Sequence, residues 1–144
     1  MILVLFGQPH SGKSTLAKKI TADHYIDGDD LRSIFVNTDY SREGRIKNLN
    51  RASDIAVYLD KKGYDVVLSL VYPIKEAREY LNNLCKEVIW VYLTYEGERG
   101  RENFHVKDFE LPTEERILSL DTSKTSVEEC IKSIKKYKDE KSLS

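Results

Sequence analysis

The stretch Gly7-Gln-Pro-His-Ser-Gly-Lys13-Ser14-Thr15 follows the apolar run Met1 to Phe6 and precedes a helix-forming segment. It completes the pattern G-x-x-x-x-G-K-[ST], in which glycines let backbone N–H groups close around the β- and γ-phosphates of a nucleotide. Lys13 would bring its ammonium group to those phosphates, the Ser14 hydroxyl would ligate Mg²⁺, and the helix would add its positive end. The predicted phosphate-binding residues are Gly7, Gln8, Pro9, His10, Ser11, Gly12, Lys13, Ser14 and Thr15.

Length and composition indicate a single domain. The chain has 144 residues, 40% of them hydrophobic, which is enough to enclose a core. Its 23 basic and 24 acidic residues give a formal charge of −1, so nothing favours nucleic acid or a membrane as a partner. The first apolar run is too short for a signal peptide or a membrane span. We expect a cytoplasmic protein with one domain over residues 1–138 and a frayed tail over 139–144.

Short apolar runs alternate with helical patterns, which is typical of a parallel sheet flanked by helices. We therefore predict an α/β fold of three layers, with about five mainly parallel strands and the ligand at their carboxyl ends. The expected strands are 2–6, 65–71, 88–93 and 117–120, with 24–26 as a fifth. The expected helices are 13–22, 41–62 and 74–85, and a last one opens at the capping box Ser126 to Glu129.

A second informative segment is Ile26-Asp27-Gly28-Asp29-Asp30-Leu31-Arg32, where a strand ends in closely spaced carboxylates. Phosphoryl transfer to a hydroxyl needs Mg²⁺ on the phosphates, cations for the spreading charge, and a carboxylate to accept the hydroxyl proton. Asp27 and Asp29 can fill the acidic roles, with Asp27 beside Ser14 as a metal ligand and Lys13 as the cation. The strand over 66–71 carries no carboxylate at its carboxyl end, which favours these two acids. The alternative is that Asp29 or Asp30 caps a helix.

Farther along lies Tyr40-Ser41-Arg42-Glu43-Gly44-Arg45-Ile46-Lys47-Asn48. Together the three segments resemble the adenylylsulfate kinase family, which joins G-x-x-x-S-G-K-S-T to L-D-G-D-N-[LIV]-R and then to aromatic-Ser-x-x-x-R-x-x-N. Ser69-Leu-Val-Tyr-Pro73-Ile74 and Leu120-Asp121-Thr122 echo two further family segments. The resemblance covers most of the chain. It implies a kinase that uses ATP and Mg²⁺ to phosphorylate the 3′-hydroxyl of adenylylsulfate, and that could pair as a homodimer.

The resemblance also implies roles for residues at matching positions. Asp29 would be the base near the acceptor hydroxyl, and Tyr40 would pack on the adenine of the acceptor. Arg45 and Asn48 are three residues apart and share a helix face, where a guanidinium and an amide could read a phosphosulfate and a base edge. Without the upstream motifs, these two would be a solvated helix face. The substrate-binding residues implied are Arg32, Tyr40, Arg45, Asn48, Ser69 and Tyr72.

Two departures from the family bear on the acceptor. Tyr72 replaces the serine before the proline, so it could reshape the pocket, supply a different hydrogen bond, or simply pack. The family has a longer lid after its fourth strand, whereas only residues 94–112 are available here; the lid candidates are Arg99, Arg101, Phe104 and Lys107. Two alternatives stay open: a kinase for another hydroxyl (nucleotide, modified base, polynucleotide end or sugar acid), or a catalytically weak nucleotide-binding module.

Overall fold

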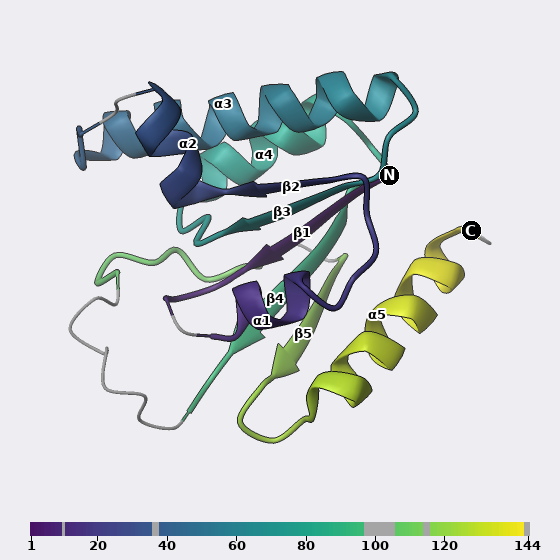
Figure 1. Cartoon of the computed structure of the whole chain (residues 1–144). Helices are drawn as coiled ribbons and strands as arrows, with labels where there is room; N and C mark the ends of the chain where they lie inside the picture. Colours follow the sequence, from purple (N-terminus) through teal and green to yellow (C-terminus); the bar gives the residue numbers. More distant parts are fainter. Residues whose placement is uncertain (10, 36–37, 97–105, 114–115, 143–144) are drawn as a thin grey trace.

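A parallel β-sheet forms the centre of the molecule (Figure 1). The computed structural model describes residues 1–9, 11–35, 38–96, 106–113 and 116–142. Within these ranges five strands pair in the order β2-β3-β1-β4-β5, and every pairing is parallel. The strands are β1 (Ile2–Phe6), β2 (His24–Asp27), β3 (Val66–Leu70), β4 (Ile89–Thr94) and β5 (Ile117–Asp121). The prediction of about five mainly parallel strands is confirmed.

Helices cover both faces of this sheet. In Figure 1, α3 and α4 lie on one side of the strands, and α1 and α5 lie on the other. The helices are α1 (Lys13–Ala17), α2 (Gly28–Phe35), α3 (Arg42–Lys61), α4 (Lys75–Leu84) and α5 (Val127–Ser142). The chain therefore has the three-layer α/β architecture expected of alternating apolar runs and helical patterns.

Burial of β1 on both faces explains why its sequence is apolar throughout. Ile2, Val4 and Phe6 belong to the core cluster that includes residues of α3 and α4. Leu3 and Leu5 point the other way, into the cluster that includes residues of α1 and α5. Because successive side chains of a strand point to opposite faces, a strand covered on both faces needs apolar residues at every position.

Helix α1 is shorter than the sequence pattern predicts. The expected helix ran to Ala22, but α1 ends at Ala17. The next amide groups make the tighter i to i+3 bonds, from Lys19 N to the Leu16 carbonyl at 3.0 Å and from Ile20 N to the Ala17 carbonyl at 3.2 Å. The Tyr25 hydroxyl then binds the backbone of residues 20 and 22. This side chain replaces the helical partners that would have continued the helix.

The structure describes a helix over the first part of the predicted tail, and the fraying of residues 139–144 stays a prediction. Helix α5 continues to Ser142. Lys141 donates from Nζ to the Val88 carbonyl at 2.8 Å, which ties the last turn to the start of β4. Half of the predicted capping box is present at the other end, where Ser126 Oγ accepts from Glu129 N at 3.2 Å, while the Glu129 carboxylate accepts from Ser126 Oγ at 3.2 Å. Both ends of the helix are thus fixed by side-chain hydrogen bonds.

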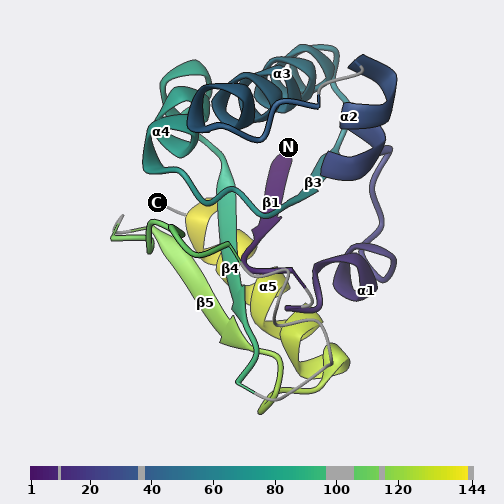
Figure 2. The same cartoon turned by 90° about the vertical axis from the view of Figure 1, so that its left-hand side faces the viewer.

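The strand order places a crevice at the end of β1. β3 and β2 lie on one side of β1, while β4 and β5 lie on the other, so the connections from the two halves diverge there. Figure 2 looks onto the carboxyl ends of the strands, where α1, α2 and the loop after β1 gather. Open α/β sheets bind ligands at such a point.

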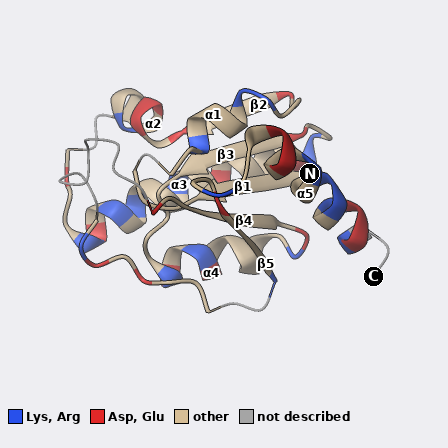
Figure 3. Ribbon diagram, turned by 90° about the horizontal axis from the view of Figure 1, so that it is seen from below, with Lys and Arg blue, Asp and Glu red and all other residues tan. Residues whose placement is uncertain are grey.

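Charged residues of both signs are interspersed on the surface. Figure 3 shows acidic and basic positions mixed along α2 and α5, which agrees with the near-zero formal charge. Of the helices described, none is long and apolar enough to cross a membrane.

Two glycines offer a matched stability test. Both have positive φ, +150° at Gly7 and +92° at Gly63, but a Cβ at Gly7 would lie 2.2 Å from the Leu93 carbonyl oxygen, whereas one at Gly63 would meet nothing within 4 Å. Gly63→Ala should cost about 1–2 kcal/mol through its backbone conformation alone. Gly7→Ala should cost about 3 kcal/mol or more because a steric clash is added. Urea unfolding measures both, and equal losses would contradict the steric argument.

Candidate active site

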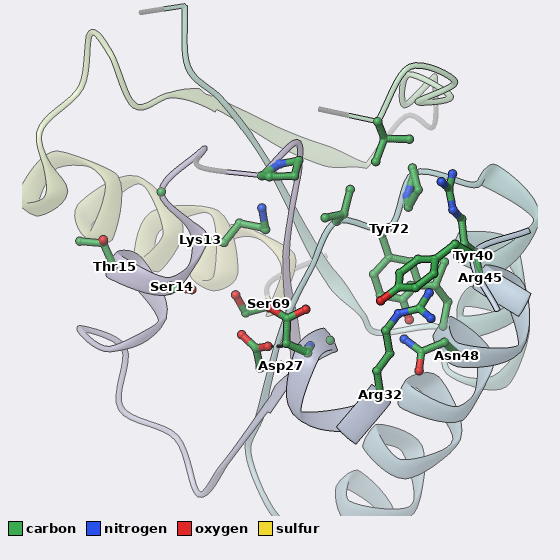
Figure 4. A pocket seen from close by; sticks show the side chains of 18 residues that line it. Lys13, Ser14, Thr15, Asp27, Arg32, Tyr40, Arg45, Asn48, Ser69 and Tyr72 are labelled. Carbon is green, nitrogen blue, oxygen red and sulfur yellow. Dashed lines mark hydrogen bonds between the residues drawn. The ribbon is translucent and has the colours of Figure 1, made fainter. Parts of the chain in front are cut away.

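A cavity of about 710 Å³ lies at the carboxyl ends of the strands. Its walls come from the loop after β1, the junction of β2 with α2, the first turns of α3 and the segment after β3 (Figure 4). Most of the residues predicted from the sequence meet there. Those that line it are Pro9, Gly12, Lys13, Ser14, Thr15, Asp27, Asp29, Arg32, Tyr40, Arg45, Asn48, Ser69 and Tyr72.

Some predicted residues do not line the cavity. Gly7, Gln8 and Ser11 belong to the loop but are not part of the wall, and Lys107 is exposed elsewhere. His10, Arg99, Arg101 and Phe104 lie outside the described residues. The wall also contains Gly28, Val71 and Pro73, which lie within the motif segments but were not among the predicted site residues, and Leu49 and Val106, which lie outside those segments. No pattern in the sequence distinguishes Leu49 and Val106, because their place depends on how distant segments pack.

Lys13 is held by the oxygens of its own loop. Its Nζ donates to the carbonyls of Gly7 at 3.1 Å and Gln8 at 2.7 Å, and to Ser11 Oγ at 3.4 Å. Burial lowers the pKa of Lys13 to about 8, although the nearby carboxylates of Asp27 and Asp29 act in the opposite direction. The amine is therefore placed where phosphate oxygens could replace the loop oxygens as partners.

The end of β5 supports the phosphate loop from the other side. Thr122 donates from Oγ1 to the Ser11 carbonyl at 2.8 Å and to the Thr94 carbonyl at 3.0 Å. A Cβ at Gly12 would lie 3.4 Å from the Thr122 methyl group. The segment Leu120-Asp121-Thr122 thus acts by bracing the loop, a role that its position late in the sequence did not reveal.

The two acids at the end of β2 have different surroundings. Asp27 accepts from Asp29 N at 2.8 Å through Oδ1, so Asp27 takes the capping role that the sequence suggested for Asp29 or Asp30. Asp27 pairs in register with Ser69 of β3, and Figure 4 shows these two side chains close together. Asp29 is exposed and lines the cavity. Its carboxylate is available for chemistry because Asp27 caps the helix.

Arg32 and Tyr40 lie together on the opposite wall. The Arg32 guanidinium carbon is 4.3 Å from the centroid of the Tyr40 ring, a cation–π contact. Tyr40 is 63% exposed, so one part of its ring is open to a ligand. The pair offers a flat apolar surface next to a positive charge.

Helix α3 presents Arg45 and Asn48 to the same wall. It begins at Arg42, because Ser41 Oγ accepts from Gly44 N at 3.2 Å as the N-cap. Asn48 is only 4% exposed, and both it and Arg45 line the cavity. The alternative of a solvated helix face therefore does not fit Asn48, while Arg45 is half-buried.

Two buried polar atoms in this wall have no hydrogen-bond partner among the described residues. They are Asn48 Oδ1 and Ser69 Oγ. An unsatisfied buried polar group costs about 1–3 kcal/mol. Both residues line the cavity, so polar groups of a bound ligand, or water, can satisfy them there.

Tyr72 is buried in the core and lines the cavity with its ring. Its hydroxyl is hydrogen-bonded to Ser53 Oγ, and its ring lies 5.4 Å from that of Trp90. Burial raises the pKa of the Tyr72 phenol. Its φ of +49° is unusual for a residue with a side chain, and its carbonyl accepts from Arg78 Nη1 at 2.7 Å. The ring therefore shapes the cavity while the hydroxyl is engaged behind it.

Comparison with known proteins agrees with this arrangement. The family model described as adenylylsulphate kinase matches residues 1–104. The chain belongs to the adenylylsulfate kinase family. Its fold is that of solved P-loop kinases such as the APS kinase of Mycobacterium tuberculosis. The matched residues include the phosphate loop, Asp27 and Asp29, and the cavity-lining residues Arg45 and Asn48 of α3.

Individual relatives are similar at moderate identity. A probable adenylyl-sulfate kinase of Aeropyrum pernix is 32% identical over 60% of the chain, and a cytidine diphosphoramidate kinase of Campylobacter jejuni is 28% identical over 64%. These matches span 52% and 59% of the two relatives, so the chain covers little more than half of their lengths. The structure of Mycobacterium tuberculosis APS kinase in complex with AMPPNP and APS has a TM-score of 0.80, at 18% identity and 96% coverage of both chains.

The pKa of Lys13 leads to a pH dependence of nucleotide binding. The free protein holds the ammonium form below about pH 8 and loses it above, whereas a bound triphosphate favours the charged form. Affinity for an ATP analogue should therefore be constant below about pH 8 and fall as the pH rises. The Lys13→Met protein should bind the ATP analogue weakly, and its affinity should not fall above pH 8. Binding titrations from pH 7 to 10 measure the affinity at each pH. An affinity of the wild type that stays constant over this range would contradict the expectation.

The Tyr72 hydroxyl can be tested separately from its ring. Ser53 Oγ donates to the Leu49 carbonyl at 3.0 Å, so the Tyr72 hydroxyl is the donor in its bond with Ser53. Tyr72→Phe should lower the free energy of unfolding by about 1 kcal/mol and leave ligand affinity unchanged. Unfolding and binding measurements on the same protein check this. A large loss of acceptor affinity with intact stability would place the hydroxyl in the ligand site.

Proposed function

We propose that the protein transfers the γ-phosphoryl group of ATP to the 3′-hydroxyl of adenylylsulfate, giving ADP and 3′-phosphoadenylylsulfate. One observation carries the proposal: a single cavity is lined by Lys13 of the phosphate loop, by the Asp29 carboxylate, and by Arg45 with Asn48 on the far wall. These are the groups needed to hold a phosphate donor, to take a hydroxyl proton and to hold an anionic acceptor.

In the proposed reaction the 3′-oxygen of the acceptor attacks the γ-phosphorus, and Asp29 accepts the proton of that 3′-hydroxyl. The bond between the β-γ bridging oxygen and the γ-phosphorus breaks, and ADP leaves. Lys13 offsets the charge on the phosphates, so the protein contributes mainly position and electrostatic stabilisation. Asp29 suits the role of base because its carboxylate is exposed and because Asp27, not Asp29, caps helix α2.

The oxygen donors at the loop fit Mg²⁺. The Ser14 hydroxyl and the Asp27 carboxylate line the same cavity and would hold the ion. Mg²⁺ prefers oxygen ligands and is usually bound by one or two protein groups together with substrate phosphates. This agrees with the described residues, where no cluster of three or more His, Cys, Asp or Glu side chains could form a complete metal site. When bound, the ion would neutralise charge on the β- and γ-phosphates.

The acceptor wall suits a nucleotide that carries extra negative charge. Arg32 and Arg45 supply two guanidinium groups, and Tyr40 supplies an exposed ring for a base. Guanidinium groups bind phosphate and sulfate oxygens through paired hydrogen bonds. The buried Asn48 adds an amide with an unsatisfied oxygen. Adenylylsulfate has a base and a phosphosulfate and can use all four residues.

A second acceptor class is favoured by Tyr72. Its ring occupies part of the cavity wall where the family pattern has a small serine, which changes the shape offered to the acceptor. The Campylobacter jejuni relative is named as a kinase of cytidine diphosphoramidate, so a relative of similar identity carries a different acceptor in its name. The second candidate is therefore a kinase of the same mechanism that phosphorylates another nucleotide.

ADP release with Mg-ATP and a panel of acceptors tests these candidates. We expect adenylylsulfate to stimulate ADP release and a product of the mass of 3′-phosphoadenylylsulfate to accumulate. Turnover of a cytidine nucleotide without turnover of adenylylsulfate would reassign the acceptor and keep the mechanism. No turnover with any acceptor, in a protein that binds ATP, would instead support a nucleotide-binding module.

Two variants test the site in this assay, and a third serves as the control. Lys13→Ala should lower turnover about 100-fold or more, because a preorganised cation on the phosphates is lost. Arg45→Ala should raise the acceptor KM about tenfold or more, since hydrogen bonds to charged groups are lost. Lys47→Ala, on an exposed position of the same helix, should behave as the wild type. An unaffected Arg45→Ala protein would exclude this wall as the acceptor site.

A further inference from the structure

The Gln8 side chain is paired with the backbone of a distant segment. Gln8 Nε2 donates to the Val106 carbonyl at 2.9 Å, and Val106 N donates to Gln8 Oε1 at 2.8 Å. One amide thus satisfies both backbone groups of Val106, as a neighbouring strand would. Gln8 does not line the cavity, but Val106 does. The side chain of this motif residue is therefore engaged with the wall and not with the place where phosphates would lie.

The backbone of Gln8 faces the catalytic lysine at the same time. Its carbonyl oxygen accepts from Lys13 Nζ at 2.7 Å and from Ser11 N at 3.2 Å. Gln8 therefore contacts Lys13 through its main-chain carbonyl and the cavity-lining residue Val106 through its side chain. No other described residue of the loop has a side-chain hydrogen bond to the segment 106–113.

The same segment is anchored to the acceptor side through Glu110. Glu110 Oε2 lies 3.0 Å from Arg42 Nη1, at the start of the helix that carries Arg45. Glu110 Oε1 accepts from Lys75 N at 3.4 Å, and the Glu110 carbonyl accepts from Arg78 Nη2 at 2.8 Å. These contacts fix one end of the segment to α3 and α4, independently of the phosphate loop.

The part between the two anchors is packed on the core. The Phe109 ring lies 5.8 Å from that of Tyr92, which in turn lies 5.2 Å from Phe6 of β1. Residues 106–110, here called the Val106 wall, therefore run from Gln8 of the phosphate loop to α3 and α4, and Val106 is the residue of this segment that lines the cavity. Only the end at Val106 depends on Gln8.

We infer that Gln8 is a positioning residue that fixes the Val106 wall to the phosphate loop and thereby sets the acceptor at the correct distance from the ATP phosphates. This inference rests on the proposed function in one respect, because it assumes that an acceptor occupies the cavity beside Val106. Gln8 touches neither substrate through its side chain. Its loss should weaken acceptor binding far more than ATP binding, since the loop backbone that holds the phosphates stays in place.

The test compares Gln8→Met and Gln8→Glu with the wild type. Methionine has a similar length but makes neither hydrogen bond, whereas glutamate can still accept from Val106 N but cannot donate to the Val106 carbonyl. Hydrogen exchange of the Val106 amide should be about tenfold or more faster in Gln8→Met. In Gln8→Met the acceptor KM should rise by a similar factor, and the ATP KM should change less than twofold. The exchange rate and the acceptor KM of Gln8→Glu should lie between those of the wild type and Gln8→Met. The urea unfolding midpoint should fall only slightly, because hydrogen bonds are lost but the core packing is kept.

Each result decides for or against this role. Unchanged exchange at Val106 in Gln8→Met overturns it, and so does an ATP KM that rises as much as the acceptor KM, which would make Gln8 a phosphate-loop residue only. Glu79→Gln, a change at an exposed position of α4, is the control and should alter neither the exchange rate of the Val106 amide nor the KM values. If the wild type phosphorylates no acceptor, the proposed function fails, but the exchange arm needs no substrate and still decides whether Gln8 holds the wall.

Discussion

The phosphate loop depends on a close approach between two backbones. β1 is buried between β3 and β4, and the chain must turn out of the sheet at Gly7 while passing the Leu93 carbonyl of β4. There is no room for a Cβ at that point. The turn brings Lys13 back over the carbonyls of the loop, and it aims the start of α1 into the crevice. A side chain at this residue would displace the loop, and with it every donor that faces the phosphates.

The two sides of the cavity are built from different kinds of structure. The phosphate-loop side is backbone curved by glycine and braced by the Thr122 hydroxyl. The acids come from the end of β2, where pairing with β3 fixes Asp27 and the cap that Asp27 provides leaves Asp29 open. The opposite side is a face of α3, whose N-cap is Ser41. Each part is rigid for its own reason, which suits a reaction that depends on positioning.

Local patterns predicted those features that depend on near neighbours. The bounds of β1 were predicted correctly, and the shared helix face of Arg45 and Asn48 follows from their spacing of three residues. The end of α1 was missed because it depends on the Tyr25 hydroxyl. The Tyr72 bond with Ser53 and the Gln8 bond with Val106 join residues far apart in the chain. Their side chains carry no local signal, so only the packed structure could reveal these contacts.

The bond from Thr122 to the Ser11 carbonyl joins residues 111 positions apart. The motif at the start of the chain is thus completed by a strand near its end. During synthesis the ribosome would release the phosphate loop long before β5 exists to brace it, and pairing at such a separation is slow because loop closure must come first. The loop is therefore braced only after β5 has joined the sheet, so a ligand that binds the braced loop would favour fully assembled molecules over partly folded ones.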